Sequence, residues 1–373
     1  MQSTLRGLWA PEQVPQPTPV PEGGWLVVDL FCSIGGVSMA VKELGHTMLL
    51  AVDYDGYRLQ THRLNHPKCA HECLELGTPE SRETVLAKIA ELVPKDQRHR
   101  LWVHASPPCT VQSGIRLSGK KRTEANYPSH DAAQRSALGL VQWTLDLILE
   151  LNPAQWSFEE VNTRLTQGTG LDADTGTVQG ILNRMRRTHG KFVDYDIFQM
   201  ADFGVPQQRK RLIAAKPATI EQMRHASALR VGKHVPTREA LEEAGCPPPK
   251  NAAFIQGPHM RKPNREKMMP SPIAEGKHTD GKVELYDVAL VPGPTVVSRK
   301  LAWVTREYTN CHDADSSEAG YLTAAQTLAL MTFPQDFRWC TDMNTETLQV
   351  NALGNAIPVR FAKAFIRAAS PLG

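Results

Sequence analysis

The sequence lacks the features of a membrane or secreted protein. No apolar run approaches the roughly 18 residues that a membrane-spanning helix needs, and the longest, at residues 145–151, is interrupted by Asp146 and Glu150. The first residues lack the basic and then apolar arrangement of a signal peptide. The seven cysteines form no CxxC pair, which favours reduced thiols in a cytoplasmic compartment and predicts no metal site.

A strong charge of one sign is also missing. The formal net charge is +3, from 42 Lys and Arg against 39 Asp and Glu, so the whole chain is not a polycation. Contact with nucleic acid must therefore come from local basic clusters, which lie at residues 116–122, 184–187, 207–211 and 261–267. Taken alone, such a cluster is more often a solvated surface than a phosphate site.

Apolar runs and helical patterns alternate through the first half of the chain. The runs predict buried strands at residues 26–31, 48–52, 101–105, 156–158, 192–198 and 211–215. Helical patterns lie at residues 37–44, 81–92 and 132–151. This alternation predicts the α/β class, with an open sheet and ligands at the carboxyl ends of its strands.

Changes in composition divide the chain into four segments. Residues 1–24 are rich in proline and predict a flexible lead-in. Residues 25–216 carry the α/β pattern, and residues 217–321 are rich in Pro, His and basic residues with poor periodicity, which predicts a smaller irregular domain. Residues 322–373 return to helical patterning and are expected to complete the first domain.

Two segments have the character of a nucleotide-binding edge. Asp29 to Gly36 reads DLFCSIGG, a strand that runs into a glycine turn and a helix, where backbone can approach a ligand. Asp53 ends the next predicted strand, where Rossmann-like folds bind adenosine-ribose hydroxyls. The alternatives are an ordinary tight turn for the first segment and a helix cap for Asp53.

A candidate nucleophile follows the strand at residues 101–105. In SPPC, two prolines stop the strand and aim the thiol of Cys109. Glu159 ends another predicted strand, and Arg209 and Arg211 share one face of an extended segment. The sequence GNAIP, at residues 354–358, opens the last predicted helix. Without this context, a cysteine is more often a small buried hydrophobe.

The order and spacing of these motifs resemble the cytosine-5 DNA methyltransferase family. That family carries DLFxGxGG, PPC, ENV, QRxR and GNA(I/V)P, which here read DLFCSIGG, SPPC, FEEV, QQRKR and GNAIP. The resemblance covers residues 25–216 and 294–368. It implies a Rossmann-like class I methyltransferase sheet with helices on both faces, plus a smaller irregular target-recognition domain. It also implies methyl transfer from S-adenosylmethionine to C5 of a cytosine flipped out of a specific duplex DNA sequence.

The resemblance assigns roles to particular residues. Cys109 would add to C6 of the base, Glu159 would serve N3, Arg211 would hold O2, and Arg209 would hold a backbone phosphate. The implied cofactor-binding residues are Asp29, Phe31, Ser33, Gly35, Gly36, Asp53, Tyr54, Glu72, Pro107, Leu140 and Asn355. The implied DNA-binding residues are Ser113, Arg116, Lys120, Lys121 and Thr295, four of them in a loop expected to close over DNA.

Three positions and one stretch depart from the family pattern. Ser33 stands for a glycine, Thr110 for a glutamine, and Glu160 for the asparagine of ENV. The RxLTxRE-like stretch at residues 320–326 has lost its arginines and its acid. A glutamate at position 160 cannot donate hydrogen bonds unless it is protonated. We therefore expect Glu160 to be either neutral or paired with Arg209 or Arg211.

Three alternatives stay open from the sequence. The first is an RNA (tRNA) cytosine-5 methyltransferase, although no Cys-Phe-Thr string follows the ENV-like motif. The second is a catalytically impaired DNA-binding relative, and the third is a thiol enzyme on another α/β scaffold, which would need a histidine base. We expect a monomer that acts on double-stranded DNA, with a cognate restriction endonuclease as the partner at the level of the whole system.

Overall fold

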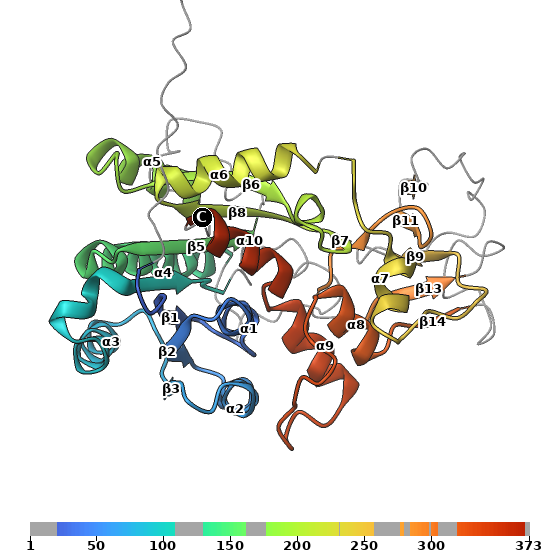
Figure 1. Ribbon diagram of the computed structural model, residues 1–373, viewed down its shortest axis with the longest axis horizontal. Helices are drawn as coiled ribbons and strands as arrows, with labels where there is room; N and C mark the ends of the chain where they lie inside the picture. Colours follow the sequence, from blue (N-terminus) through green and yellow to red (C-terminus); the bar gives the residue numbers. More distant parts are fainter. Residues whose placement is uncertain are drawn as a thin grey trace, which may run out of the picture.

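A twisted sheet with helices on both faces makes up the larger part of the molecule (Figure 1). The computed structural model describes residues 21–108, 130–161, 177–230, 232–256, 277–279, 284–297, 300–304 and 319–369. Within them, seven strands lie in the order β3-β2-β1-β4-β5-β8-β6. Their bounds are β1 Leu26–Leu30, β2 Thr47–Asp53, β3 Ala70–Cys73, β4 Leu101–Ala105, β5 Gln155–Val161, β6 Asp194–Gln199 and β8 Lys210–Ala215.

The chain order of these strands creates a switch point at β1. β1 pairs in parallel with β2 on one side and with β4 on the other. The chain therefore runs from β1 through β2 to β3 at one edge of the sheet, and then crosses to the other side of β1 to form β4. Only β8 runs against its neighbours, β5 and β6. Open α/β sheets bind ligands outside the carboxyl ends of the strands at such a reversal. The predicted α/β class with an open sheet is confirmed.

Two apolar cores lie on opposite faces of the sheet. Leu26, Val28 and Leu30 of β1 face one core and Val27 faces the other, as the two-residue period of a strand requires. The first core is covered by α3 (Pro79–Leu92), α4 (His130–Leu151) and α5 (Val178–Thr188). The second is covered by α1 (Gly36–Glu43), α2 (Gly56–Asn65), α6 (Pro217–Ala228) and α10 (Val359–Ala369).

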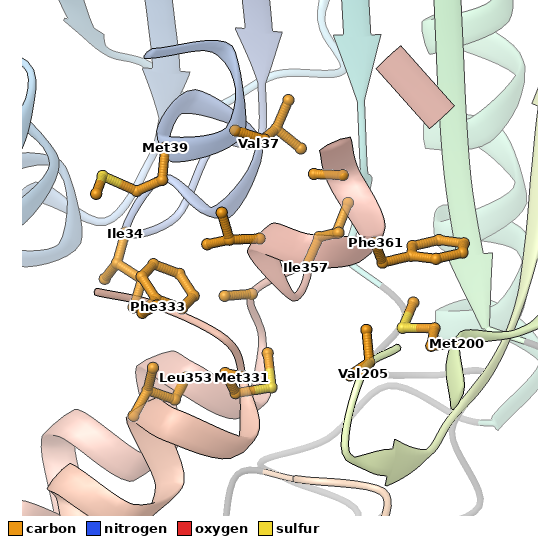
Figure 2. Packing of buried hydrophobic residues seen from close by; sticks show 14 of the residues in the cluster. Ile34, Val37, Met39, Met200, Val205, Met331, Phe333, Leu353, Ile357 and Phe361 are labelled. Atoms are coloured by element: carbon orange, nitrogen blue, oxygen red, sulfur yellow. The ribbon is translucent and has the colours of Figure 1, made fainter. Parts of the chain in front are cut away.

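The second core joins the first turn of the chain to its last helix. Figure 2 shows Ile34 and Val37 from the beginning of the chain in the same cluster as Ile357 and Phe361 near its end. Phe333 and the buried Met331 and Leu353 continue this core toward the smaller part of the molecule. This packing supports the expectation that the C-terminal segment completes the first domain, and the division into domains stays a prediction.

The segment expected to be irregular contains a second sheet. Its described strands lie in the order β10-β11-β9-β13-β14 and pair antiparallel. Their bounds are β9 Phe254–Gln256, β10 Lys277–Thr279, β11 Glu284–Asp287, β13 Ala302–Val304 and β14 Ala319–Tyr321. Strands of three or four residues are too short to show a period, which explains why the sequence pattern missed them. Figure 1 places this sheet beside α7 (Thr237–Glu243) and α8 (Ala324–Leu330), and α9 (Glu346–Gly354) packs against α8.

The helix α6 falls on the other side of the domain limit expected at residue 217. It packs against β6 and α10, and its buried Ile220 and Met223 belong to the second core. We therefore infer that the first domain extends through this helix to about residue 228. Among the described residues, no helix is long and apolar enough to cross a membrane.

Candidate active site

The segments that carry the motifs meet at the carboxyl edge of the sheet. Cys32, in the turn after β1, donates its backbone N–H to the Val52 carbonyl on β2 at 3.1 Å. Ser106, which follows β4, donates its N–H to the Leu30 carbonyl at 3.3 Å. The turn after β1 is thus fixed from both sides, at the point where the strand order reverses.

The turn itself adopts backbone conformations that most side chains avoid. Phe31 and Ser33 have φ values of 62° and 49°, and Gly35 has φ of 93°. A residue other than glycine at positive φ is strained, so Ser33 occupies a position that favours the glycine it replaces. A Cβ added to Gly36 would lie 2.0 Å from the Ile357 carbonyl oxygen. Only glycine allows the DLFCSIGG turn and the GNAIP segment to approach this closely.

Asp53 is held by the backbone on both sides of its strand end. One carboxylate oxygen accepts the Ser33 N–H at 2.8 Å and the other accepts the Asp55 N–H at 2.9 Å. Burial raises the pKa of Asp53, and these two hydrogen bonds oppose the rise. The cap of α2 is Asp55, which accepts from Tyr57 and Arg58, so the helix-cap alternative for Asp53 is wrong.

The other residues expected to bind the cofactor lie at different depths. Asp29 is buried below the turn, whereas Tyr54 is 63% exposed. Glu72 on β3 lies 3.7 Å from the Lys88 ammonium. Leu140 on α4 approaches Gly77, the residue before the N-cap of α3. Pro107 is buried and Asn355 is exposed, with its amide donating to the Asn351 carbonyl at 2.9 Å.

Glu159 and Arg211 form an ion pair at the other half of the edge. Their neighbouring strands, β5 and β8, place Arg211 Nε 2.9 Å from a Glu159 carboxylate oxygen. Both side chains are largely buried. The expected joint placement of these two residues agrees with the structure, and β4, which leads toward Cys109, is the other neighbour of β5.

Glu160 is buried next to this pair without an arginine of its own. Its Oε1 accepts the Val161 N–H at 2.9 Å, and its Oε2 has no hydrogen-bond partner among the described residues. Burial, with a contribution from the charge of Glu159, raises the pKa of Glu160 to about 8. Of the two states expected from the sequence, the neutral carboxyl group is the one that this environment favours.

Arg209 lies in a different place from the phosphate contact expected for it. Its guanidinium is 3% exposed and donates to the carbonyls of Val296, Gly354 and Ala356 at 2.9, 3.4 and 3.2 Å. A guanidinium enclosed by carbonyls cannot also reach a phosphate on the surface, so this placement supports a clamp between the GNAIP segment and Val296.

Thr295 belongs to the same junction between the two parts of the molecule. It follows β12 (Gly293–Pro294), which pairs with β7 (Gln207–Gln208). The Thr295 hydroxyl donates to the Gln208 carbonyl at 2.7 Å. Its expected contact with DNA stays a prediction.

Five of the expected site residues lie outside the described part of the chain: Cys109, Ser113, Arg116, Lys120 and Lys121. Sequence reasoning also missed three residues beside the turn after β1. These are Ser38, His62 and His71, which form a buried hydrogen-bonded chain with Asp29. A histidine pair at helical spacing, His62 and His66, was the only signal that could have pointed to them.

The fold and this edge define a class I methyltransferase, and two solved structures share the fold. The S. pombe Dnmt2 methyltransferase matches with a TM-score of 0.53 and 16% identity, over 92% of this chain and 97% of that one. The Entamoeba histolytica methyltransferase EhMeth matches with a TM-score of 0.51 and 13% identity, over the same shares of the two chains.

The chain belongs to the C-5 cytosine-specific DNA methylase family, whose model matches residues 26–370. Enzymes of this family are cytosine-5 DNA methyltransferases that use S-adenosylmethionine. The Type II methyltransferase M.XorII of Xanthomonas oryzae is 30% identical over 186 residues, which are 50% of this chain and 39% of that protein. The Type II methyltransferase M1.HphI of Haemophilus parahaemolyticus is 24% identical over 357 residues, which are 91% of this chain and 85% of that protein.

Proposed function

We propose that this protein methylates C5 of a cytosine that is flipped out of a specific duplex DNA sequence, through a covalent bond between Cys109 and C6. One observation carries the proposal. Glu159 and Arg211 lie 2.9 Å apart, buried at the ends of adjacent strands, beside the strand that leads to Cys109. An acid and a guanidinium at this distance match the N3 and O2 edge of one cytosine.

One half of the sheet edge, formed by β1, β2 and β3 and called the donor half below, fits S-adenosylmethionine. The buried carboxylates of Asp29 and Asp53 favour a cationic ligand, and a second Asp29 oxygen has no hydrogen-bond partner within the described ranges. Each oxygen of Asp53 has a lone pair left for a ribose hydroxyl, because a carboxylate has about four acceptor sites. The exposed ring of Tyr54 is available to the adenine, and Phe31 would lie on its other side.

Further residues would complete the donor pocket. Gly35 and Gly36 keep the turn free of side chains, with Ser33 between them and β1. Pro107, Leu140 and Asn355 would close the pocket, and Glu72 would face the adenine edge. When bound, S-adenosylmethionine supplies an electrophilic methyl group on a sulfonium.

The other half of the edge, formed by β4, β5 and β8 and called the base half below, would make C5 of cytosine nucleophilic. Addition of the Cys109 thiolate to C6 breaks the aromaticity of the base and moves electron density toward C5 and N3. Glu159, which must be protonated when the base is bound, would give its proton to N3 as this charge develops, and Arg211 would hold O2. After the methyl group arrives, loss of the C5 proton expels the thiolate and restores the ring.

DNA would lie between the sheet edge and the smaller domain. The target base must leave the duplex, because C5 and C6 cannot be reached within the stack. Ser113, Arg116, Lys120 and Lys121 would contact the DNA from the loop after Cys109, and Thr295 from the domain junction. We assign sequence reading to residues 229–321. The Type II relatives support a role beside a cognate restriction endonuclease, with the methyltransferase acting as a monomer.

The test uses duplex DNA that contains 5-fluorocytosine. Fluorine at C5 cannot leave as the proton does, so the wild-type protein and S-adenosylmethionine should give an adduct that survives denaturation. Cys109→Ser should form no adduct and should still bind S-adenosylmethionine. Bisulfite sequencing of DNA from cells that express the protein would identify the methylated sequence. Methylation without an adduct would overturn the covalent mechanism, and absence of methylation would overturn the function.

A further inference from the structure

A chain of hydrogen bonds runs toward the surface from below the DLFCSIGG turn after β1, which is called the donor turn here. The Ser38 hydroxyl on α1 donates to Asp29 Oδ2 at 3.0 Å. His62 Nε2 lies 2.8 Å from the same hydroxyl oxygen, and His62 Nδ1 lies 2.8 Å from His71 Nε2. Asp29, Ser38 and His62 are almost completely buried, whereas His71 on β3 is partly exposed.

The His62 ring also supports the turn from below. A Cβ placed on Gly35 would lie 2.8 Å from His62 Cδ2 and 3.1 Å from His62 Nε2. The ring therefore fills the space directly beneath the glycine that gives the donor turn its left-handed conformation. Among the described residues, no group of His, Cys, Asp and Glu side chains is arranged to hold a metal ion, so the hydrogen bonds themselves explain this cluster.

We propose that His62 is a positioning residue for the donor turn, and that Asp29, Ser38, His62 and His71 act as one proton-conducting chain between this turn and the surface. The proposal rests on the placement of S-adenosylmethionine at the turn after β1. It adds Ser38, His62 and His71, which none of the motifs contains.

The direction of the chain follows from the charge of Asp29. While Asp29 is ionised, Ser38 donates to it, so the Ser38 oxygen must accept from His62 Nε2–H. His62 Nδ1 then carries no proton and accepts from His71 Nε2–H. Every proton in the chain points inward, which gives the buried carboxylate a stabilising partner that solvent does not provide.

When His71 Nδ1 takes up one proton, donor and acceptor exchange roles in every hydrogen bond of the chain, and the buried groups carry no charge. His71 passes its Nε2 proton to His62 Nδ1, His62 passes its Nε2 proton to Ser38, and Ser38 passes its proton to Asp29. Asp29 is then neutral, His62 has changed its tautomer, and His71 keeps the new proton on Nδ1. Burial raises the pKa of Asp29 to about 7, so both states exist near neutral pH. Burial lowers the pKa of His62 well below its usual value, which keeps its ring neutral in both.

Other charged and titratable groups face the chain from each element packed around it. They are Cys32 in the turn, Lys42 on α1, Asp53 on β2, Arg63 and His66 on α2, and Cys69 before β3. Asp53 opposes ionisation of Asp29. Lys42 and His71 oppose a positive charge on His66, and Arg63 opposes one on His71. Accumulated positive charge is therefore disfavoured around His62, and a neutral relay is favoured.

The first test compares donor binding by variants of the full-length protein. Ser38→Ala and His62→Leu should each weaken S-adenosylmethionine binding roughly tenfold, as the loss of about one buried hydrogen bond predicts. The KM for S-adenosylmethionine should rise with it, while kcat at saturation changes by less than about threefold. His62→Gln keeps a donor toward Ser38 and should recover most of the affinity. His46→Gln, at a partly buried histidine outside the chain, is the matched control and should bind as the wild type does.

The second test follows the His62 tautomer by nitrogen NMR on protein labelled with [¹⁵N]histidine, with His62→Gln assigning the signals. His62 should carry its proton on Nε2 above about pH 7 and on Nδ1 below it, and Ser38→Ala should abolish the exchange. A single tautomer from pH 6 to pH 8, or unchanged donor affinity in Ser38→Ala, overturns the proposal. If DNA is methylated but these readouts do not move, only this inference fails; absence of methylation and adduct would instead remove the proposed function.

Discussion

The two halves of the sheet edge differ in how their polar groups are satisfied. On the donor half, formed by β1, β2 and β3, Asp53 holds two backbone N–H groups and Asp29 ends a hydrogen-bonded chain. On the base half, formed by β4, β5 and β8, Glu159 pairs with Arg211, whereas the adjacent buried Glu160 has no ion pair among the described residues and its Oε2 has no hydrogen-bond partner there. The acids of the donor half are thus held by N–H and hydroxyl donors, whereas the base half holds Glu159 through a guanidinium.

The largest expected effect lies on the base half. Glu159→Gln keeps the shape of the side chain but removes its proton-donating role, so kcat should fall by about 10²–10⁴-fold. Binding of S-adenosylmethionine should stay within about twofold of the wild type, because the donor half is untouched. Glu160→Gln is the matched control and should retain activity. Single-turnover methylation and calorimetry measure the two quantities, and a fully active Glu159→Gln would assign the N3 proton to another group.

Substitution of Arg209 tests whether this side chain clamps the GNAIP segment to Val296 or contacts DNA. Arg209→Met removes the donors to three buried carbonyls and should lower the free energy of unfolding by about 3 kcal/mol. The slope of log K for DNA against log salt should not change, because no phosphate contact is lost. Lys120→Ala, in the expected DNA loop, should reduce that slope by about one. A slope reduced by Arg209→Met would restore the phosphate role.

Glu160 should make stability depend on pH in a defined window. Its pKa is about 8 in the folded protein against an ordinary value of 4.5, so the folded state holds the extra proton between these values. This contribution is fully present below about pH 4.5 and is lost as pH rises to about 8, by roughly 1.4 kcal/mol per pH unit at most.

The measurement is denaturant unfolding of wild type and Glu160→Gln from pH 5 to pH 9. The variant should gain stability relative to the wild type as pH rises, and the difference should become constant above about pH 8. Glu83→Gln, at an exposed acid on α3, should show no such trend. A difference independent of pH would mean that Glu160 is ionised and compensated in the folded protein.

The smallest expected effect tests the exposed rim of the donor half. Tyr54→Ala should weaken S-adenosylmethionine binding roughly tenfold through loss of stacking, and Tyr54→Phe should not change it. Tyr57 is a matched control, since it is 57% exposed on the adjacent helix against 63% for Tyr54. Equal effects of Tyr57→Ala and Tyr54→Ala would show that the adenine does not lie against Tyr54.

The sequence predicted the parts of this structure that depend on local pattern. The apolar runs identified the strands that became β1, β2 and β4, and the motifs placed Glu159 and Arg211 at one site. It did not predict the small sheet, whose short strands show no period, or the partners of Arg209, which lie far along the chain. It also missed the His62 chain, because β1, α1, α2 and β3 bring its members together only after the sheet has formed.

The contact between Gly36 and Ile357 has a consequence for synthesis of the protein. These residues are about 320 positions apart, and the carbonyl of Ile357 lies against the turn that contains Gly36. Such a distant pairing forms late, because the intervening chain must first be ordered. A nascent chain on the ribosome therefore has no finished donor pocket until the GNAIP segment emerges. We expect a chain that lacks the GNAIP segment to leave this turn uncovered and not to methylate DNA.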